Sequence, residues 1–148
     1  MLRGNAAEPH QVTLTREVPP ALAPAARMLP SKIGYLRVAE FAASTPTALR
    51  QAAARLQGDG AKALILDLRG CREGEIEEAR AFLNLFLKNE RAGTFEKKNG
   101  QKDVFACPAD PVVAPDLPLI VWVGPATMGP SEIAAGVLRA QCPTAMRA

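Results

Sequence analysis

Two short runs of consecutive apolar residues constrain the fold of this chain more than any other feature. One covers residues 63–66 (Ala-Leu-Ile-Leu) and the other covers residues 117–123 (Leu-Pro-Leu-Ile-Val-Trp-Val). An unbroken apolar run is typical of a strand that is covered on both faces, because a strand with one face in solvent alternates. Both runs lead into glycine-bearing turns and then into helical patterns. The sequence therefore predicts an α/β domain with a mostly parallel central sheet flanked by helices, and Trp122 is expected in its core.

Three helical patterns accompany these strands. The first is expected to have Thr45 as its N-cap and Pro46 in its first turn, where the missing N–H costs nothing, and to end at Gly58. The second has an apolar stripe within residues 76–87 and glutamates in its first turns, where negative charge suits the helix dipole. The third is expected to open at residues 130–132.

A further strand and a hairpin complete the predicted domain. Residues 33–38 form a short β-rich run, which indicates a strand. Residues 94–105 predict a β-hairpin insertion that turns at Asn99-Gly100. In parallel sheets, sites form beyond the carboxyl ends of the strands, so loops 67–74 and 124–131 are where chemistry is expected.

The amino-terminal region has a different composition from the rest of the chain. Residues 11–16 alternate apolar and polar side chains and predict a short strand. Residues 19–31 are rich in proline and alanine without a regular period, which is typical of a linker. We therefore expect a domain boundary there, with residues 32–148 forming the α/β domain.

Composition argues against several classes of function. The net charge is only +3 and the basic residues are scattered, so no nucleic-acid partner is expected. The three cysteines lie far apart and His10 is the sole histidine, so neither a metal nor a cofactor is predicted. No apolar run reaches the roughly 20 residues of a membrane span, and residues 1–10 lack the layout of a secretory signal.

Three segments resemble, in order and spacing, the protease domain of the carboxyl-terminal-processing (tail-specific) serine protease family. They are residues 33–41, the Asp-Leu-Arg loop that begins at Asp67, and residues 121–133, which match the family's strand, elbow and helix ending in Ser-Ala-Ser-Ala-Ser-Glu-Ile. The resemblance implies a ClpP/crotonase-like protease core over residues 32–148 that is incomplete at its carboxyl end.

The same resemblance implies neighbours and partners. Residues 12–16 are similar to the last strand of the PDZ domain that usually precedes this fold, so residues 1–18 are expected to end a PDZ-like domain. The implied partner is an extended peptide or a protein C-terminal tail, and the implied location is extracytoplasmic. Missing carboxyl-terminal strands would leave a sheet edge unpaired, so oligomer formation through that edge is a further expectation.

The resemblance also points to a degenerate active site. The family's nucleophile falls on Gly129, which has no side chain, and its oxyanion-hole positions fall on Pro130, which lacks an N–H, and on Gly74. Glu73 replaces a glycine beside that hole, and the family's base lysine would lie beyond Ala148. The expected role is therefore non-catalytic, in peptide binding or assembly.

Two other side chains are candidate nucleophiles. Ser131 is the fallback: with a lysine further along the parent protein, it would make the chain an active serine-type endopeptidase with a shifted nucleophile. A hydroxyl in the first turn of a helix, however, commonly bonds to the local backbone. Cys71 has no histidine neighbour to lower its pKa. Asp67 and Arg69 are expected to support their loop rather than to react.

Overall fold

The computed structural model describes residue 13 and residues 22–96, 98–142 and 145–147. Strands and helices alternate along most of this part of the chain. In order, the elements are β1 (Ala25–Leu29), a 3-10 turn (Pro30–Lys32), β2 (Ile33–Arg37), α1 (Thr45–Gly58), β3 (Ala63–Asp67), α2 (Ile76–Leu83), β4 (Asn89–Glu96), β5 (Lys102–Cys107), β6 (Leu119–Trp122), α3 (Pro130–Gln141) and β7 (Ala145–Arg147).

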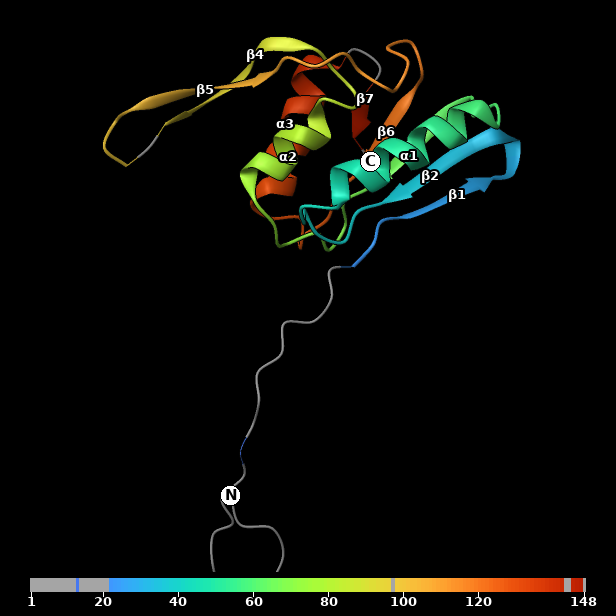
Figure 1. Cartoon of the computed structure of the whole chain (residues 1–148), viewed down its shortest axis with the longest axis horizontal. Coiled ribbons are helices and arrows are strands. Elements are labelled where there is room, and N and C mark those ends of the chain that lie inside the picture. The colour runs from blue at the N-terminus through green and yellow to red at the C-terminus, as the bar shows by residue number, and fades with distance from the viewer. Residues whose placement is uncertain (1–12, 14–21, 97, 143–144, 148) are drawn as a thin grey trace, which may run out of the picture.

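Five strands form one sheet in the order β1-β2-β3-β6-β7, and β4 and β5 form a separate antiparallel hairpin (Figure 1). The pairs β2–β3, β3–β6 and β6–β7 are parallel, whereas β1 runs antiparallel to β2. The register aligns Leu36, Leu66 and Val121 across β2, β3 and β6. The predicted α/β fold, with a mostly parallel sheet and a hairpin insertion, is confirmed.

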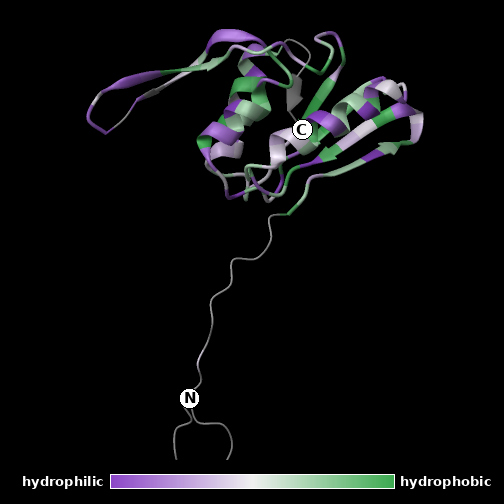
Figure 2. Cartoon of the chain, in the orientation of Figure 1, coloured by the Kyte–Doolittle hydropathy of each residue, from purple (hydrophilic) through white to green (hydrophobic). Residues whose placement is uncertain are grey.

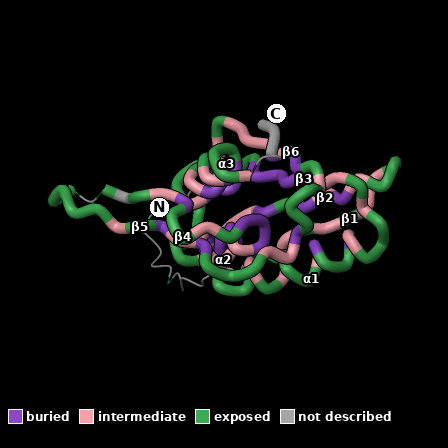
Figure 3. Tube along the Cα trace, turned by 90° about the horizontal axis from the view of Figure 1, so that it is seen from above, coloured by how far each residue is buried: buried purple, intermediate pink, exposed green. Residues whose placement is uncertain are grey.

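The three helices form one layer on one face of the sheet. Each connection β2-α1-β3, β3-α2-β6 and β6-α3-β7 moves the chain one strand in the same direction, and right-handed crossovers then place every helix on the same face. In Figure 3, α1 and α2 lie along the same side of the strands. The side chains between sheet and helices are almost fully buried, and each contributes about 2 kcal/mol; the largest include Leu36, Leu64, Leu66, Leu119, Leu49, Leu56 and Phe82.

The opposite face of the sheet is not covered by any of the described helices. Successive residues of a strand point to opposite faces, so Tyr35 and Trp122 alternate with the buried residues that meet the helices. Both side chains are half-buried. Trp122 therefore lies outside the main core, contrary to expectation, because Leu119 and Val121 of the same strand take the positions that face the helices.

β1 lies within residues 19–31, which were expected to be a linker. It pairs with β2 along its whole length, and this backbone pairing outweighs the weak β propensity of its alanines. Pro24 and Pro30 flank the strand, where a missing N–H costs no ladder hydrogen bond. The strand expected to end a PDZ-like domain within residues 1–18 lies outside the described residues, except for Thr13.

Two helix boundaries differ from the prediction. The N-cap of α1 is Ser44, and Thr45 is the first helical residue. The Thr45 hydroxyl instead donates a hydrogen bond to the carbonyl of Glu40 at 3.1 Å. α2 ends at Leu83, and residues 84–87 continue in tight turns that still bury the apolar side chains predicted for the helix.

The β4–β5 hairpin projects away from the body of the domain (Figure 1). Its base is anchored by Phe105, which is 1% exposed, and its outer part is mostly hydrophilic (Figure 2). The predicted turn at Asn99-Gly100 is confirmed, because Glu96 pairs with Lys102 and Gly100 has a φ of 80°.

The loop after β2 and the loop after β3 meet at Phe41 and Gly74. The Phe41 N–H donates to the carbonyl of Glu73 at 3.0 Å, and the Glu75 N–H donates to the carbonyl of Phe41 at 3.2 Å. Gly74 has a φ of 134°, and a Cβ added there would lie 2.5 Å from the Phe41 carbonyl oxygen and 2.7 Å from its Cα. Only glycine fits this crossing of two loops.

Gly74→Ala is expected to lower the free energy of unfolding by about 2 to 4 kcal/mol, because the new methyl group must displace the Phe41 backbone. Urea denaturation measures the change. Gly70→Ala is the matched control: Gly70 also has a positive φ, 82°, but a Cβ there meets nothing within 4 Å, so the loss should be about 1 kcal/mol. Equal losses in the two variants would contradict the steric explanation.

Candidate functional site

The loop that follows β3 and the loop that follows β6 lie against each other at one edge of the sheet. β3 and β6 are adjacent and parallel, so the loops that follow them leave the sheet at the same edge. Three hydrogen bonds join the loops: Thr127 Oγ1 to the Leu68 carbonyl at 3.0 Å, Met128 N–H to the Cys71 carbonyl at 3.1 Å, and Ser131 Oγ to the Cys71 carbonyl at 2.6 Å. The two predicted loops thus form one structural unit.

Asp67 anchors the first loop at the end of β3. Its carboxylate accepts the backbone N–H of Arg69 at 3.0 Å, the guanidinium of Arg69 at 2.9 Å through two nitrogens, and the hydroxyl of Tyr35 at 2.7 Å. The Asp67 side chain is only 3% exposed, so these charge-assisted bonds are shielded from water. Arg69 also lies over the ring of Trp122, at 4.5 Å.

The pKa of Asp67 reflects two opposing effects. Burial raises it, because burial disfavours the charged form. The hydrogen bonds from Arg69 and Tyr35 and the positive charge of Arg69 outweigh burial and bring the pKa to about 2. Asp67 is therefore ionised at neutral pH and committed to its partners, which suits a loop anchor better than a general acid or base.

Gly129 occupies the sharp turn from β6 into α3. It is the N-cap of α3, with φ 60° and ψ −125°, a conformation that L side chains rarely adopt. A Cβ added at Gly129 has no heavy atom within 4 Å, so a side chain at this position would project into open space. Strand-to-helix elbows of this kind present the nucleophile in α/β-hydrolases. In this chain the elbow has the backbone shape but presents no reactive group.

Pro130 is the first residue of α3. Proline suits this position because the N–H that it lacks would have no partner inside the helix. The same N–H would otherwise be available to stabilise an oxyanion next to the elbow. Pro130 therefore favours the start of the helix and removes a donor from the predicted oxyanion hole.

Ser131 lies in the first turn of α3 and is 1% exposed. Its hydroxyl donates to the Cys71 carbonyl at 2.6 Å, has the Met128 carbonyl as a second acceptor at 2.8 Å, and accepts the Met128 N–H at 3.1 Å. A hydroxyl with its proton and lone pairs in these bonds connects the two loops. It does not point toward open space as a side chain at position 129 would.

Cys71 lies beneath the same joint and is 0% exposed. Burial raises the pKa of its thiol to about 11, an effect that the nearby Ser131 hydroxyl partly offsets and the negative charge of Glu40 reinforces. The thiol is therefore protonated at neutral pH, and the reactive thiolate is not formed.

The described residues contain no group of three or more histidine, cysteine, aspartate or glutamate side chains placed to hold a metal ion. Nor do they include a helix that is long and apolar enough to span a membrane. At the start of α2, Glu77 forms an ion pair with Arg80 at 3.0 Å.

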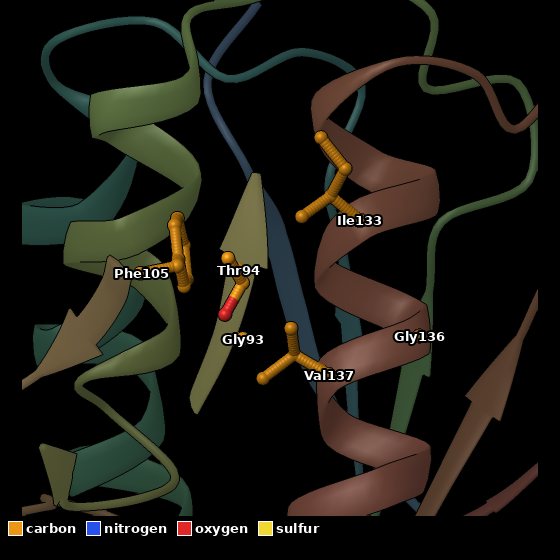
Figure 4. Close-up of a pocket in the computed structure, with 6 residues that line it drawn as sticks. All are labelled: Gly93, Thr94, Phe105, Ile133, Gly136 and Val137. Carbon is orange, nitrogen blue, oxygen red and sulfur yellow. The ribbon is translucent and has the colours of Figure 1, made fainter. Parts of the chain in front are cut away.

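An apolar pocket of about 270 Å³ lies between the hairpin and α3. Figure 4 shows its lining: Gly93, Thr94, Phe105, Ile133, Gly136 and Val137. No local sequence signal indicates this pocket. Residues 133, 136 and 137 have helical spacing, but no local signal shows that the hairpin lies beside that face of α3.

A mostly parallel sheet in which a strand-to-helix elbow meets an Asp-Leu-Arg loop is the arrangement that the sequence resemblance predicted for a peptidase domain. The chain belongs to peptidase family S41, whose family model matches residues 32–144. The predicted relationship to tail-specific proteases is confirmed.

Curated relatives are carboxyl-terminal-processing proteases. The carboxy-terminal processing protease CtpA of Bacillus subtilis is 32% identical over 128 residues, which cover 86% of this chain and 27% of that protein. The carboxyl-terminal-processing protease of Synechocystis is 31% identical over 136 residues, covering 88% of this chain and 31% of that protein. The chain thus spans less than a third of the length of these relatives.

Solved structures share the fold. The photosystem II D1 C-terminal processing protease superposes with a TM-score of 0.71 at 23% identity, covering 81% of this chain and 32% of that one. A lipoprotein from Streptococcus agalactiae gives a TM-score of 0.64 at 15% identity, covering 86% of this chain and 49% of that one.

Ser131→Ala is expected to lower the free energy of unfolding by about 1 to 3 kcal/mol, because the Cys71 carbonyl and the Met128 N–H lose a buried partner. Chemical denaturation measures the loss. Ser44→Ala is the control, because the exposed Ser44 makes no side-chain capping bond, and its change should stay within about 0.5 kcal/mol. Similar values for both variants would mean that the buried hydroxyl does not stabilise the joint.

Asp67 is expected to make stability fall as the pH is lowered. Its pKa is depressed in the folded state, so its contribution is complete above about pH 5 and is lost as the pH falls toward 2. A depression of nearly two units corresponds to about 2 kcal/mol. Unfolding measured from pH 7 to pH 2 should show a shallower decline for Asp67→Asn than for the natural chain. Parallel curves would contradict this assignment.

Proposed function

We propose that this domain is a non-catalytic member of peptidase family S41 that binds an extended peptide or a protein C-terminal tail, alone or as part of an assembly. The observation that carries the proposal is the pair Gly129 and Pro130 at the elbow. Removing a single oxyanion donor typically costs about 3 kcal/mol of transition-state stabilisation, and removing a nucleophile costs about 10⁶-fold in rate. The two changes together leave no hydrolytic mechanism at this position.

The rival proposal is an active serine-type endopeptidase in which Ser131 attacks and a lysine elsewhere in the parent protein acts as base. The environment of Ser131 argues against it. An attacking hydroxyl must reach the substrate carbonyl, whereas the Ser131 side chain is buried and bonded to the Cys71 carbonyl. The non-catalytic proposal therefore agrees better with the geometry.

The pocket between β4 and α3 supports peptide binding. Among the described strands β4 pairs only with β5, so its other edge offers backbone groups to an added strand. Ile133 and Val137 line the pocket from α3, and Ile133 lies about one turn beyond Gly129. A peptide that extends β4 would place apolar side chains against α3 and pass along the helix that starts at the elbow. The relatives' names, which specify carboxyl-terminal processing, make a protein tail a fitting ligand.

The proposal is tested by measuring cleavage and binding on the same protein. A quenched-fluorescence peptide with apolar side chains and a free C-terminal carboxylate should show no turnover with the natural chain. Turnover that disappears in Ser131→Ala would establish the rival proposal. Fluorescence anisotropy of the same peptide, labelled with fluorescein, should show binding.

Val137→Gln should weaken that binding about tenfold, because it places an amide in the apolar pocket. Val104→Gln is the matched control, since Val104 is 48% exposed and does not line the pocket. Equal affinities for the two variants would rule out this pocket as the peptide site.

A further inference from the structure

The helix-free face of the sheet carries an ordered patch of side chains, which we name the arginine face. The register places Arg27, Tyr35, Ile65 and Ile120 in one row across β1, β2, β3 and β6. The next row is Ala25, Arg37, Asp67 and Trp122. Because paired residues in a sheet point to the same side, these side chains share one surface.

Arginines and aromatic rings alternate across this face. The Arg27 guanidinium lies 5.1 Å from the centre of the Tyr35 ring, and that ring meets Trp122 edge to face at 6.1 Å. The Arg69 guanidinium lies over the Trp122 ring, 4.5 Å from its centre. Arg37 follows Tyr35 by two residues on the same strand, and its positive charge acts on the Tyr35 hydroxyl. These contacts hold the side chains in place before any partner arrives, which reduces the entropy lost on binding.

The charges on the arginine face are not balanced within the described chain. Asp67 is its one acidic residue, and Asp67 is already bonded to Arg69 and Tyr35. Neither Arg27 nor Arg37 has a carboxylate within 4 Å among the described residues, and both side chains are exposed. A partner that brings carboxylates would complete these pairs.

We propose that the arginine face is a second interaction surface, which binds an acidic protein segment that also carries aliphatic side chains. Trp122, Tyr35 and the arginines are the residue types that dominate binding energy at protein interfaces. Aliphatic side chains of the segment meet the half-buried Ile120, and its carboxylates meet Arg27 and Arg37. This surface lies on the sheet face opposite the helices, so it is separate from the pocket of the proposed peptide site.

Two other occupants fit the surface less well. A second copy of the chain would bring its own three arginines against these, and like charges repel. A single-stranded nucleic acid needs a series of stacking rings, whereas this face offers two rings that already contact each other, beside aliphatic residues. Charge complementarity therefore selects an acidic segment.

The test uses the one tryptophan of the chain, Trp122, as a reporter, because it lies on the arginine face. The probe is the peptide Glu-Val-Glu-Leu-Glu-Val-Glu-Leu, with matched peptides in which glutamine or lysine replaces every glutamate. Titration with the acidic peptide should change the Trp122 fluorescence, and raising the salt concentration should weaken the binding. The double variant Arg27→Gln with Arg37→Gln should bind at least about tenfold more weakly.

Arg50→Gln with Arg139→Gln is the matched control, since it removes the same charge from exposed positions on the helical layer and should bind like the natural chain. Equal weakening in both double variants would mean that net charge alone attracts the peptide, and would overturn the proposal. The proposal would also be overturned if the glutamine or lysine peptide bound as tightly as the acidic peptide, or if single-stranded RNA bound more tightly. A dimer in sedimentation that becomes more stable in the variant Arg27→Gln with Arg37→Gln would overturn it as well. Val137→Gln should leave this binding unchanged, so failure of the peptide pocket and failure of the arginine face can be told apart.

Discussion

The carbonyl oxygen of Cys71 is the point on which the candidate site depends. It accepts the Ser131 hydroxyl at 2.6 Å and the Met128 N–H at 3.1 Å, and so ties the loop after β3 to the elbow after β6. Both loops start from adjacent parallel strands, which brings them to the same edge, but strand pairing alone does not set their separation. The buried hydrogen bonds set this separation. If the loops moved apart, the Cys71 carbonyl, the Ser131 hydroxyl and the Met128 N–H would lose buried partners, which costs free energy.

The elbow between β6 and α3 is built from two residues that satisfy the backbone and offer neither a side-chain nucleophile nor an N–H at position 130. Gly129 adopts a turn with positive φ that favours glycine, with open space around its Cβ position, and Pro130 suits the first position of α3. Helix formation and loop packing depend on backbone geometry, which both residues satisfy. Nucleophilic attack and oxyanion stabilisation depend on a side chain and an N–H, which both residues lack. The packing around the elbow therefore places no demand on the chemistry of residues 129 and 130.

The two faces of the sheet have different chemistry for a topological reason. Every parallel crossover turns the same way, so the helices cover one face and leave the other to residues such as Tyr35 and Trp122. The strand residues on the covered face are buried, and most of them are leucine or valine. On the helix-free face, arginines lie against aromatic rings, and Asp67 links that face to the loop of the candidate site through Arg69. The domain thus has one edge for the elbow and one face suited to a partner.

The sequence alone determined the three helices, the strands β2, β3 and β6, the hairpin turn at Asn99-Gly100 and the turn at Gly129 that leads into α3. These features rest on local signals: apolar runs, prolines and glycines act within a few residues of themselves. The same signals failed for β1, whose alanines become a strand because β2 offers backbone partners, and for Trp122, whose direction depends on which face the helices cover. They also gave no indication of the pocket beside α3 or of the side-chain contacts that link Arg27, Tyr35 and Trp122. Only the tertiary structure decided these, because each depends on segments that are far apart in the chain and meet through the register of the sheet and the packing of helices upon it.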